Sequence, residues 1–387
     1  MPVASRHYLL PVLLGSASFV FLNFGLPIQA KRLGADATLI GGMYTVFTLT
    51  MVVVRPLVGW ALDRYGRRWF FASAFGFYTV AMWAFSRATG VDDFYLARFL
   101  QGIGASLMWV SVRTIVADEF DTAERGREMG RLQANSVRGS MLGAFYGFTL
   151  IGMMPQEEAW RLAFYGYSVV ALAGFVLACL RQRESSQPAA TGRRVELVWN
   201  ADIVRLLVIV FVSGFASALI EPIYLIYLQD KFSLSFMQLA MAFLPAGIVY
   251  ATLPVVTGRW ADRFGRMPLM VSGIALAALA SISLPWLGHI LMVAGLYTLS
   301  AVAWTMAIPA EDALLGDLSE AATRGRLFGM REMAAMTGAA IGPLLGGAIY
   351  DYWRAEFAFV INGALLLIAS GLAWHWFRGM APASIER

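Results

Sequence analysis

Long apolar stretches, separated by short polar segments, run through almost the whole chain. Each has about the 20 residues that a helix needs to cross the hydrocarbon core of a bilayer. In chain order the predicted spanning helices are 8–30, 39–62, 69–89, 93–116, 132–154, 160–181, 203–229, 236–261, 268–287, 289–315, 329–352 and 354–377. The pattern therefore predicts an all-α integral membrane protein with twelve transmembrane helices.

The longest polar interruption divides these helices into two groups of six. Residues 182–202 are rich in Arg, Ser, Gln and Pro, a composition typical of a linker. We predict an N-terminal six-helix bundle over residues 1–181, a cytoplasmic linker over 182–202, and a C-terminal six-helix bundle over 203–387. The two bundles are expected to be pseudo-symmetric.

The composition and charge of the chain also favour an integral membrane protein over a soluble one. Of the 387 residues, 59% are hydrophobic and only 14% are charged, whereas soluble domains are about 25% charged. The net charge of +5 comes from basic residues that gather in the loops on one side of the predicted helices. Because basic loops stay inside the cell, we expect both termini to be cytoplasmic in the inner or plasma membrane, and we expect no nucleic-acid partner.

The sequence gives little support for a metal site or a disulfide bond. The chain has one cysteine, Cys179, and three histidines that are far apart in sequence. These residues give neither a disulfide framework nor the ligand spacing of a metal site, so no metal is expected.

A loop segment recurs in the two halves. GWALDRYGRR begins at Gly59, and GRWADRFGRM begins 199 residues later at Gly258. The same offset carries Asp118 onto Asp317, and it also carries three glycines, Gly139, Gly143 and Gly147, onto Gly338, Gly342 and Gly346. Six helices separate the copies, so the repeat is parallel in topology, as in established transporter folds. A duplicated channel or membrane enzyme would show the same repeat.

The residues of this loop motif suggest contacts at the cytoplasmic face. Gly66 would supply backbone freedom for a tight turn, and Gly59 would allow a neighbouring helix to approach closely. Asp63 could pair with the positive N-terminus of a helix from the other half. Arg67 could bond Asp118, with Arg266 and Asp317 as the mirror pair. Alternatively, the arginines only fix the topology. The full predicted set is Gly59, Asp63, Arg64, Gly66, Arg67, Asp118, Asp262, Arg263, Gly265, Arg266 and Asp317.

These motifs resemble those of the major facilitator superfamily, and the resemblance covers essentially the whole chain. The family's loop motif is Gly-x-Leu-Ala-Asp-Arg-x-Gly-Arg-Arg/Lys. The segment ARFLQGIGAS, with Arg98, Gln101, Gly102 and Gly104, is similar to the Arg-x-x-Gln-Gly-x-Gly pattern of its proton-driven drug exporters. The resemblance implies two bundles that alternate access to a central substrate, with the loop contacts latching the outward-facing state.

Ionisable residues inside membrane spans are costly and indicate function. Glu221, followed by the helix-kinking Pro222, could bind and release a proton, or it could form a permanent ion pair with Arg98. The predicted substrate-binding residues are Asn23, Arg98, Trp109, Arg113, Arg138, Glu221 and Tyr224, with Glu221 also the proton-coupling residue. Further intramembrane charges are Arg55, Glu311, Asp312, Arg331 and Glu332. Other side chains that could face a cavity are Phe19, Tyr146, Tyr227, Trp304 and Met306.

Two features depart from the drug-exporter pattern and leave the direction of transport open. The fifth helix lacks the proline of Gly-x-x-x-Gly-Pro-x-x-Gly-Gly, which stands instead at 338–347, and Asn23 occupies a place where an acidic residue is common. Several arginines and one glutamate favour an anionic or zwitterionic substrate.

We therefore predict a monomeric secondary transporter. It would export an amphipathic or anionic small molecule, such as a drug, siderophore or metabolite, using the proton gradient and no bound cofactor. The alternative is proton-coupled uptake of an organic anion. An enzyme is not expected, because the chain lacks HExxH and Gly-x-Ser-x-Gly motifs, and ATP-driven transport is not expected without a GxxxxGK[ST] motif.

Overall fold

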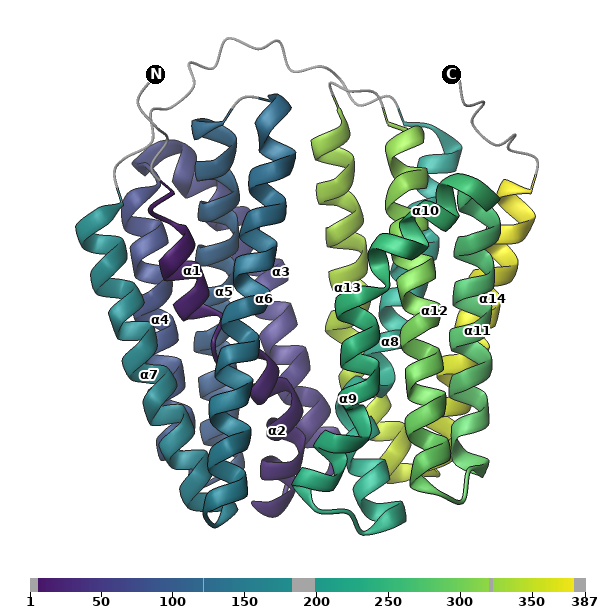
Figure 1. Ribbon diagram of the computed structural model, residues 1–387, viewed down its shortest axis with the longest axis horizontal. Coiled ribbons are helices and arrows are strands. Elements are labelled where there is room, and N and C mark those ends of the chain that lie inside the picture. The colour runs from purple at the N-terminus through teal and green to yellow at the C-terminus, as the bar shows by residue number, and fades with distance from the viewer. Residues whose placement is uncertain (1–5, 121, 183–198, 320–322, 379–387) are drawn as a thin grey trace. The chain divides into compact units, whose positions relative to one another are not determined.

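The chain forms two helical units in a computed structural model that describes residues 6–120, 122–182, 199–319 and 323–378 (Figure 1). One unit comprises residues 1–35 with 42–192, and the other comprises 36–41 with 193–387. Every regular element in the described ranges is helical, which confirms the all-α class. Most of the predicted linker, residues 183–198, lies outside the described part of the chain.

The helices of the first half are α1 (Leu9–Gly15), α2 (Phe19–Arg32), α3 (Ala37–Tyr65), α4 (Arg68–Arg87), α5 (Val91–Glu119), α6 (Thr122–Met153) and α7 (Gln156–Arg181). Those of the second half are α8 (Ala201–Phe232), α9 (Phe236–Thr252), α10 (Pro254–Phe264), α11 (Arg266–Ser283), the short 3₁₀ turn η1 (Leu284–Trp286), α12 (Ile290–Asp317), α13 (Arg324–Tyr352) and α14 (Ala355–Phe377). Nine stretches of the described chain are long and apolar enough to span a membrane. The count of twelve spans therefore stays a prediction.

Two of the predicted spans are interrupted. The first, 8–30, breaks into α1 and α2 at Ser16–Ser18, where two serines follow Gly15, and both residue types have lower helix propensity than alanine or leucine. The eighth, 236–261, breaks into α9 and α10 at Pro254, which has no backbone N–H to continue the helix. The length of an apolar run does not indicate where a helix is interrupted, so neither break was predicted.

Glycines bring α6 close to α1 and the segment that follows it. A Cβ built on Gly139 would lie 2.1 Å from the Leu13 carbonyl oxygen, and one on Gly143 would lie 1.7 Å from that of Ala17. No larger residue fits there without separating the two backbones, as is typical of small-residue contacts in membrane helices.

The second half uses its matched glycines in the same way. A Cβ on Gly338 would lie 2.5 Å from the Phe211 carbonyl oxygen, and one on Gly346 would lie 1.8 Å from that of Leu219. α13 thus packs along α8 as α6 packs along α1 and α2 (Figure 1). The sequence repeat is therefore also a repeat of backbone packing.

Candidate functional site

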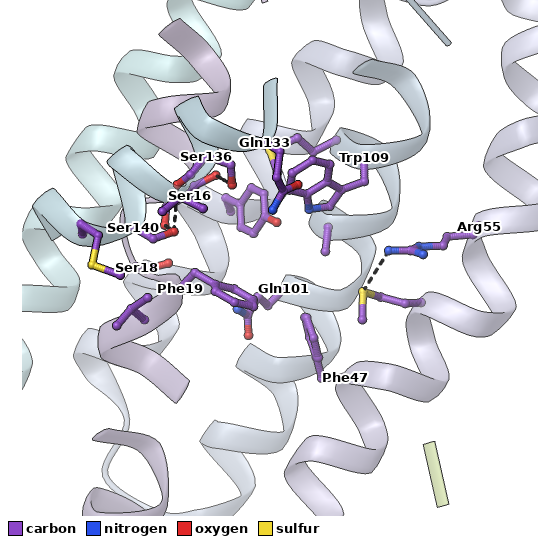
Figure 2. Close-up of a pocket in the computed structure, with 18 residues that line it drawn as sticks. Ser16, Ser18, Phe19, Phe47, Arg55, Gln101, Trp109, Gln133, Ser136 and Ser140 are labelled. Atoms are coloured by element: carbon purple, nitrogen blue, oxygen red, sulfur yellow. Dashed lines mark hydrogen bonds between the residues drawn. The ribbon is translucent and has the colours of Figure 1, made fainter. Parts of the chain in front are cut away.

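A cavity of about 350 Å³ lies inside the first unit, lined by the α1–α2 break and by α3, α4, α5 and α6 (Figure 2). Its apolar lining is aromatic and thioether-rich, and includes Phe19, Phe47, Tyr78, Trp109, Met51, Met108 and Met141. Its polar lining consists of Ser16, Ser18, Ser136, Ser140, Gln101, Gln133 and Arg55. Such a mixture of apolar surface and a few polar groups is typical of a small-molecule site.

Serine hydroxyls form one side of this cavity. The Ser16 and Ser136 hydroxyl oxygens are 2.8 Å apart, and the Ser140 hydroxyl donates to the carbonyl oxygens of Ser16 and Ser136 at 3.0 Å each. These bonds hold the end of α1 against α6. The broken helix thereby brings hydroxyls and backbone to a cavity, which is where irregular backbone is tolerated within a membrane protein.

Arg55 lies on the opposite side of the cavity from these serines, with Phe19 and Gln101 between them (Figure 2). Its Nη2 is 3.9 Å from the sulfur of Met51, one turn earlier on α3. Among the eighteen lining residues, all of them within the described ranges, Arg55 is the one charged side chain. The cavity thus combines a cation with aromatic surface, and the lining contains no carboxylate.

Arg98 is fully buried and is not part of the cavity lining. Its guanidinium carbon lies 4.4 Å from the ring centroid of Tyr44 and 5.0 Å from that of Phe47, and its Nη1 donates to Gln101 Oε1 at 3.0 Å. The Tyr44 hydroxyl in turn donates to the Asn23 carbonyl oxygen at 2.8 Å. Arg98 therefore holds the Gln101 amide, and Gln101 faces the cavity.

The other predicted substrate residues of the first half occupy different surroundings. Trp109 lines the cavity, whereas Arg113 and Arg138 are exposed and are not among its lining residues. The Arg113 guanidinium carbon lies 5.6 Å from the Trp109 ring centroid. Asn23 is connected to this region through its backbone oxygen.

In the second unit, Glu221 and Tyr224 lie on α8. Glu221 is exposed, and Tyr224 packs in an aromatic cluster with Phe243, Tyr297 and Phe359 at centroid distances of 5.1 to 5.7 Å. The Phe243–Tyr297 contact, 4.4 Å between centroids, occupies the positions that match Tyr44 and Arg98 at the 199-residue offset. Glu221 and Arg98 belong to different units, so an ion pair between them stays a prediction.

The two ion pairs expected from the loop motif are present. Arg67 Nε lies 2.9 Å from Asp118 Oδ2, with both side chains nearly buried, and Arg67 Nη1 also donates to the Leu62 carbonyl oxygen. Arg266 pairs with Asp317 in the second half, where both side chains are more exposed. Each pair lies within one unit and fastens the motif loop to the end of α5 or α12.

Gly66 and Gly265 have φ angles of 89° and 95°, in the left-handed region that favours glycine. The motif therefore requires glycine at this turn. Within the first unit, a Cβ built on Gly59 meets nothing within 4 Å, so no helix of that unit approaches it closely. The same holds for Gly258 within the second unit. The close contacts are made instead by the glycines of α6 and α13.

Two further arginines of the loop motif lie beside aromatic rings. The Arg64 guanidinium carbon lies 5.9 Å from the Trp60 ring centroid, and that of Arg263 lies 5.5 Å from Phe264. The side chains of Asp63 and Asp262 lie outside the part that the structure describes.

Sequence reasoning missed several residues of this site. The serines of the α1–α2 break and Gln133 carry no prediction, and Arg55, although an intramembrane charge, is not in the predicted substrate-binding set. A signal existed for the serines, because Ser16 and Ser18 interrupt an apolar run and Ser136 and Ser140 share one face of a helix at a spacing of four residues.

Known proteins resemble this chain along its whole length. The Major Facilitator Superfamily profile matches residues 9–202 and 206–386. Multidrug resistance protein 1 of Bacillus subtilis (strain 168) is 24% identical over 396 residues, covering 98% of both chains.

Two solved structures share the fold. One is a bacterial homolog of the human lysosomal transporter Spinster in an inward-facing and occupied conformation, with a TM-score of 0.77, 14% identity, and coverage of 97% of this chain and 96% of that one. The other is the human organic anion transporter MFSD10, with a TM-score of 0.69, 17% identity, and coverage of 95% and 98%.

Proposed function

Because the chain belongs to the Major Facilitator Superfamily, whose members are transporters, we propose that it is a secondary transporter that exports an amphipathic anionic small molecule. The observation that carries the anionic preference is the cavity of the first unit, where Arg55 is the one charged residue among the described lining. The relationship to a multidrug resistance protein supports export.

The arrangement of the lining suggests how such a molecule binds. A carboxylate, sulfonate or phosphate group would accept hydrogen bonds from Arg55, and charge-assisted bonds of this kind are stronger than neutral ones. The apolar part would pack on Phe19, Phe47 and Trp109, whose rings offer large contact areas. Gln101, held by Arg98, and the serines would hydrogen-bond further polar groups of the substrate.

The conformational part of the proposal concerns the loop motifs. The Arg67–Asp118 and Arg266–Asp317 pairs hold each motif loop in a fixed position relative to its own unit. We propose that this fixed loop makes the cytoplasmic latch of the outward-facing state, which breaks when access alternates. The protein would act as a monomer in the inner or plasma membrane, with both termini in the cytoplasm.

The substrate preference can be tested with two probes that share one ring system. Naphthalene-2-sulfonate is a permanent anion, and 2-naphthyltrimethylammonium is a permanent cation of similar size. We expect the purified protein to bind the anion more tightly in equilibrium dialysis. Arg55→Gln should weaken anion binding by roughly tenfold or more, as expected for the loss of a charge-assisted hydrogen bond, with little effect on the cation.

A matched control is Arg161→Gln, since Arg161 is an exposed arginine that pairs with Glu157 one turn away on α7. Its affinity for both probes should equal that of the wild type. Tighter binding of the cation by the wild type, or an equal loss of anion affinity in Arg161→Gln, would refute the assignment to Arg55.

We further propose that the proton gradient drives export, with Glu221 as the carboxylate that sequence reasoning assigns to coupling. Proteoliposomes that contain the protein allow the gradient to be imposed with either polarity. Export by antiport predicts that naphthalene-2-sulfonate moves against the proton flow. Movement of the probe together with protons would instead support uptake of an organic anion, and flux that ignores the gradient would exclude proton coupling.

A further inference from the structure

Two adjacent carboxylates of α12 meet one arginine of α13, its neighbour in the second unit (Figure 1). Arg331 Nη2 lies 2.6 Å from Glu311 Oε1, and Arg331 Nε donates to the same oxygen at 2.8 Å. Arg331 Nε also lies 3.3 Å from Asp312 Oδ1. The Arg331 guanidinium thus forms ion pairs with two carboxylates.

The charges of this cluster do not balance. With both acids ionised, Glu311, Asp312 and Arg331 carry a net charge of −1, and Glu332 adds a further negative charge near the arginine. The Glu311 side chain is only 6% exposed, while that of Asp312 is 41% exposed. A surplus buried charge is costly, and a single proton on one of the two carboxylates removes it.

The first half shows that the fold does not need these charges. At the 199-residue offset, Val112 matches Glu311 and Leu132 matches Arg331. Both of these residues are buried and apolar. The loop ion pairs and the glycine contacts occur in both halves, whereas this cluster occurs in one. A packing requirement therefore does not explain it.

Helix α12, which carries Glu311 and Asp312, contains a proline close to the cluster. Pro309, two residues before Glu311, has no N–H for the carbonyl oxygen of Thr305, and the Thr257 hydroxyl of α10 donates to that oxygen instead at 2.6 Å. A side-chain hydrogen bond replaces a backbone hydrogen bond at this point and links α12 to α10. Helix α10 contains the start of the second copy of the loop motif. A change of charge at Glu311 thus acts two residues from the point where Pro309 interrupts the backbone hydrogen bonds of α12.

The other elements packed against α12 bring few charges to this place. On α8, Arg205 pairs with Asp202, the Tyr350 hydroxyl donates to Asp230, and Lys231 donates to the Pro285 carbonyl oxygen. Glu221 of α8 is exposed and lies near Tyr297 of α12. On α11, Arg266 pairs with Asp317. On α10, Arg259 and Arg263 are exposed, and the sequence of α9 contains no charged residue. Among the described residues, the charges that act on Glu311 are those of Arg331 and Asp312, while Glu332 acts on Arg331.

We propose that the Glu311–Asp312–Arg331 cluster is a proton-binding site of the transport cycle. The proton binds a Glu311 oxygen, Arg331 then pairs with Asp312 alone, and the cluster becomes neutral. The half-exposed Asp312 provides the route between solvent and Glu311. This inference rests on the proposed proton-coupled transport, and it adds a carboxylate to the one that sequence reasoning selected.

Infrared difference spectroscopy of the purified full chain tests proton binding without any substrate, when the pH is lowered only to about 6, above the range in which exposed carboxylates titrate. We expect the carbonyl stretch of a protonated carboxyl to appear in the wild type and to be lost in Glu311→Gln. In Asp312→Asn the band should need a lower pH, because the neighbouring negative charge is gone. The control Glu157→Gln removes an exposed carboxylate of α7 and should leave the band unchanged.

Transport adds a second readout. In proteoliposomes, Glu311→Gln should still exchange labelled for unlabelled naphthalene-2-sulfonate but should lose accumulation driven by a pH gradient. Retained exchange would show that the variant is folded.

The inference is overturned if the band persists in Glu311→Gln, or if this variant retains gradient-driven accumulation. A band that is lost in Glu221→Gln instead would assign the proton to Glu221. Absence of gradient-driven flux in the wild type would count against the proposed function, while the infrared band would still decide whether the cluster binds a proton.

Discussion

Replacing Gly143 by Ala tests the packing that holds the broken first helix against α6. A Cβ at this position would lie 1.7 Å from the Ala17 carbonyl oxygen, so the two backbones must move apart by more than about 1 Å in a close-packed interior. Overpacking of this kind costs about 1–3 kcal/mol. Because Ala17 lies between Ser16 and Ser18, the same movement displaces part of the cavity lining.

The matched control is Gly130→Ala on the same helix. A Cβ there meets nothing within 4 Å, and alanine is favoured over glycine in a helix by about 0.5–1 kcal/mol. Thermal unfolding in detergent should therefore show a lower Tm for Gly143→Ala and an equal or higher Tm for Gly130→Ala.

Binding of naphthalene-2-sulfonate provides the functional readout for both glycine variants. We expect weaker binding by Gly143→Ala and unchanged binding by Gly130→Ala. Equal stability of the two variants, or unchanged binding by Gly143→Ala, would show that α6 and the α1–α2 break are not in the contact described above.

Two further predictions concern ionic contacts. Arg67→Ala removes the cation that pairs with the nearly buried Asp118 and should lower the free energy of unfolding by about 3–5 kcal/mol. Arg266→Ala acts on the more exposed pair and should lower it by about 1 kcal/mol or less. Equal losses of Tm in the two variants would contradict this difference. The two hydrogen bonds from Arg6, and then the one from Arg131, lower the pKa of Glu128. Their stabilisation is therefore present above the ordinary glutamate pKa of 4.5 and is lost as the pH falls below it. Glu128→Gln should flatten this acid loss of Tm, and an unchanged pH profile would refute the contribution of Glu128.

The parts of the fold that could be predicted from sequence rest on local or repeated features. The lengths of the apolar runs predicted the helices. The 199-residue offset predicted the Arg67–Asp118 and Arg266–Asp317 pairs, because the same arginine and aspartate recur in both halves and imply the same contact between the loop and a helix end. Gly66 and Gly265 were predictable from the tight turn that they form.

The candidate site was less predictable because it depends on how helices rotate about their axes. Helical spacing placed Arg98 and Trp109 on one broad face, but only tertiary packing decides that Trp109 reaches the cavity while Arg98 is buried against Tyr44 and Phe47. Tyr44 and Phe47 both lie on α3, so the sequence of α5 contains no signal for their contact with Arg98. The α1–α2 break was missed for a related reason, since its serines are stabilised by α6.

The two halves keep the same backbone contacts but differ in side-chain chemistry. Glycine packing and loop ion pairs occur in both, yet Arg55 and Gln101 of the cavity match Pro254 and Ser300, and the Glu311–Arg331 pair matches Val112 and Leu132. Duplication accounts for the shared frame, and the differences accord with the proposed division of substrate recognition and proton binding between the halves. On this argument Arg55→Gln should lower probe affinity and leave the infrared band intact, while Glu311→Gln should remove the band and leave affinity close to that of the wild type. Loss of both properties in either variant would show that the two roles are not separated.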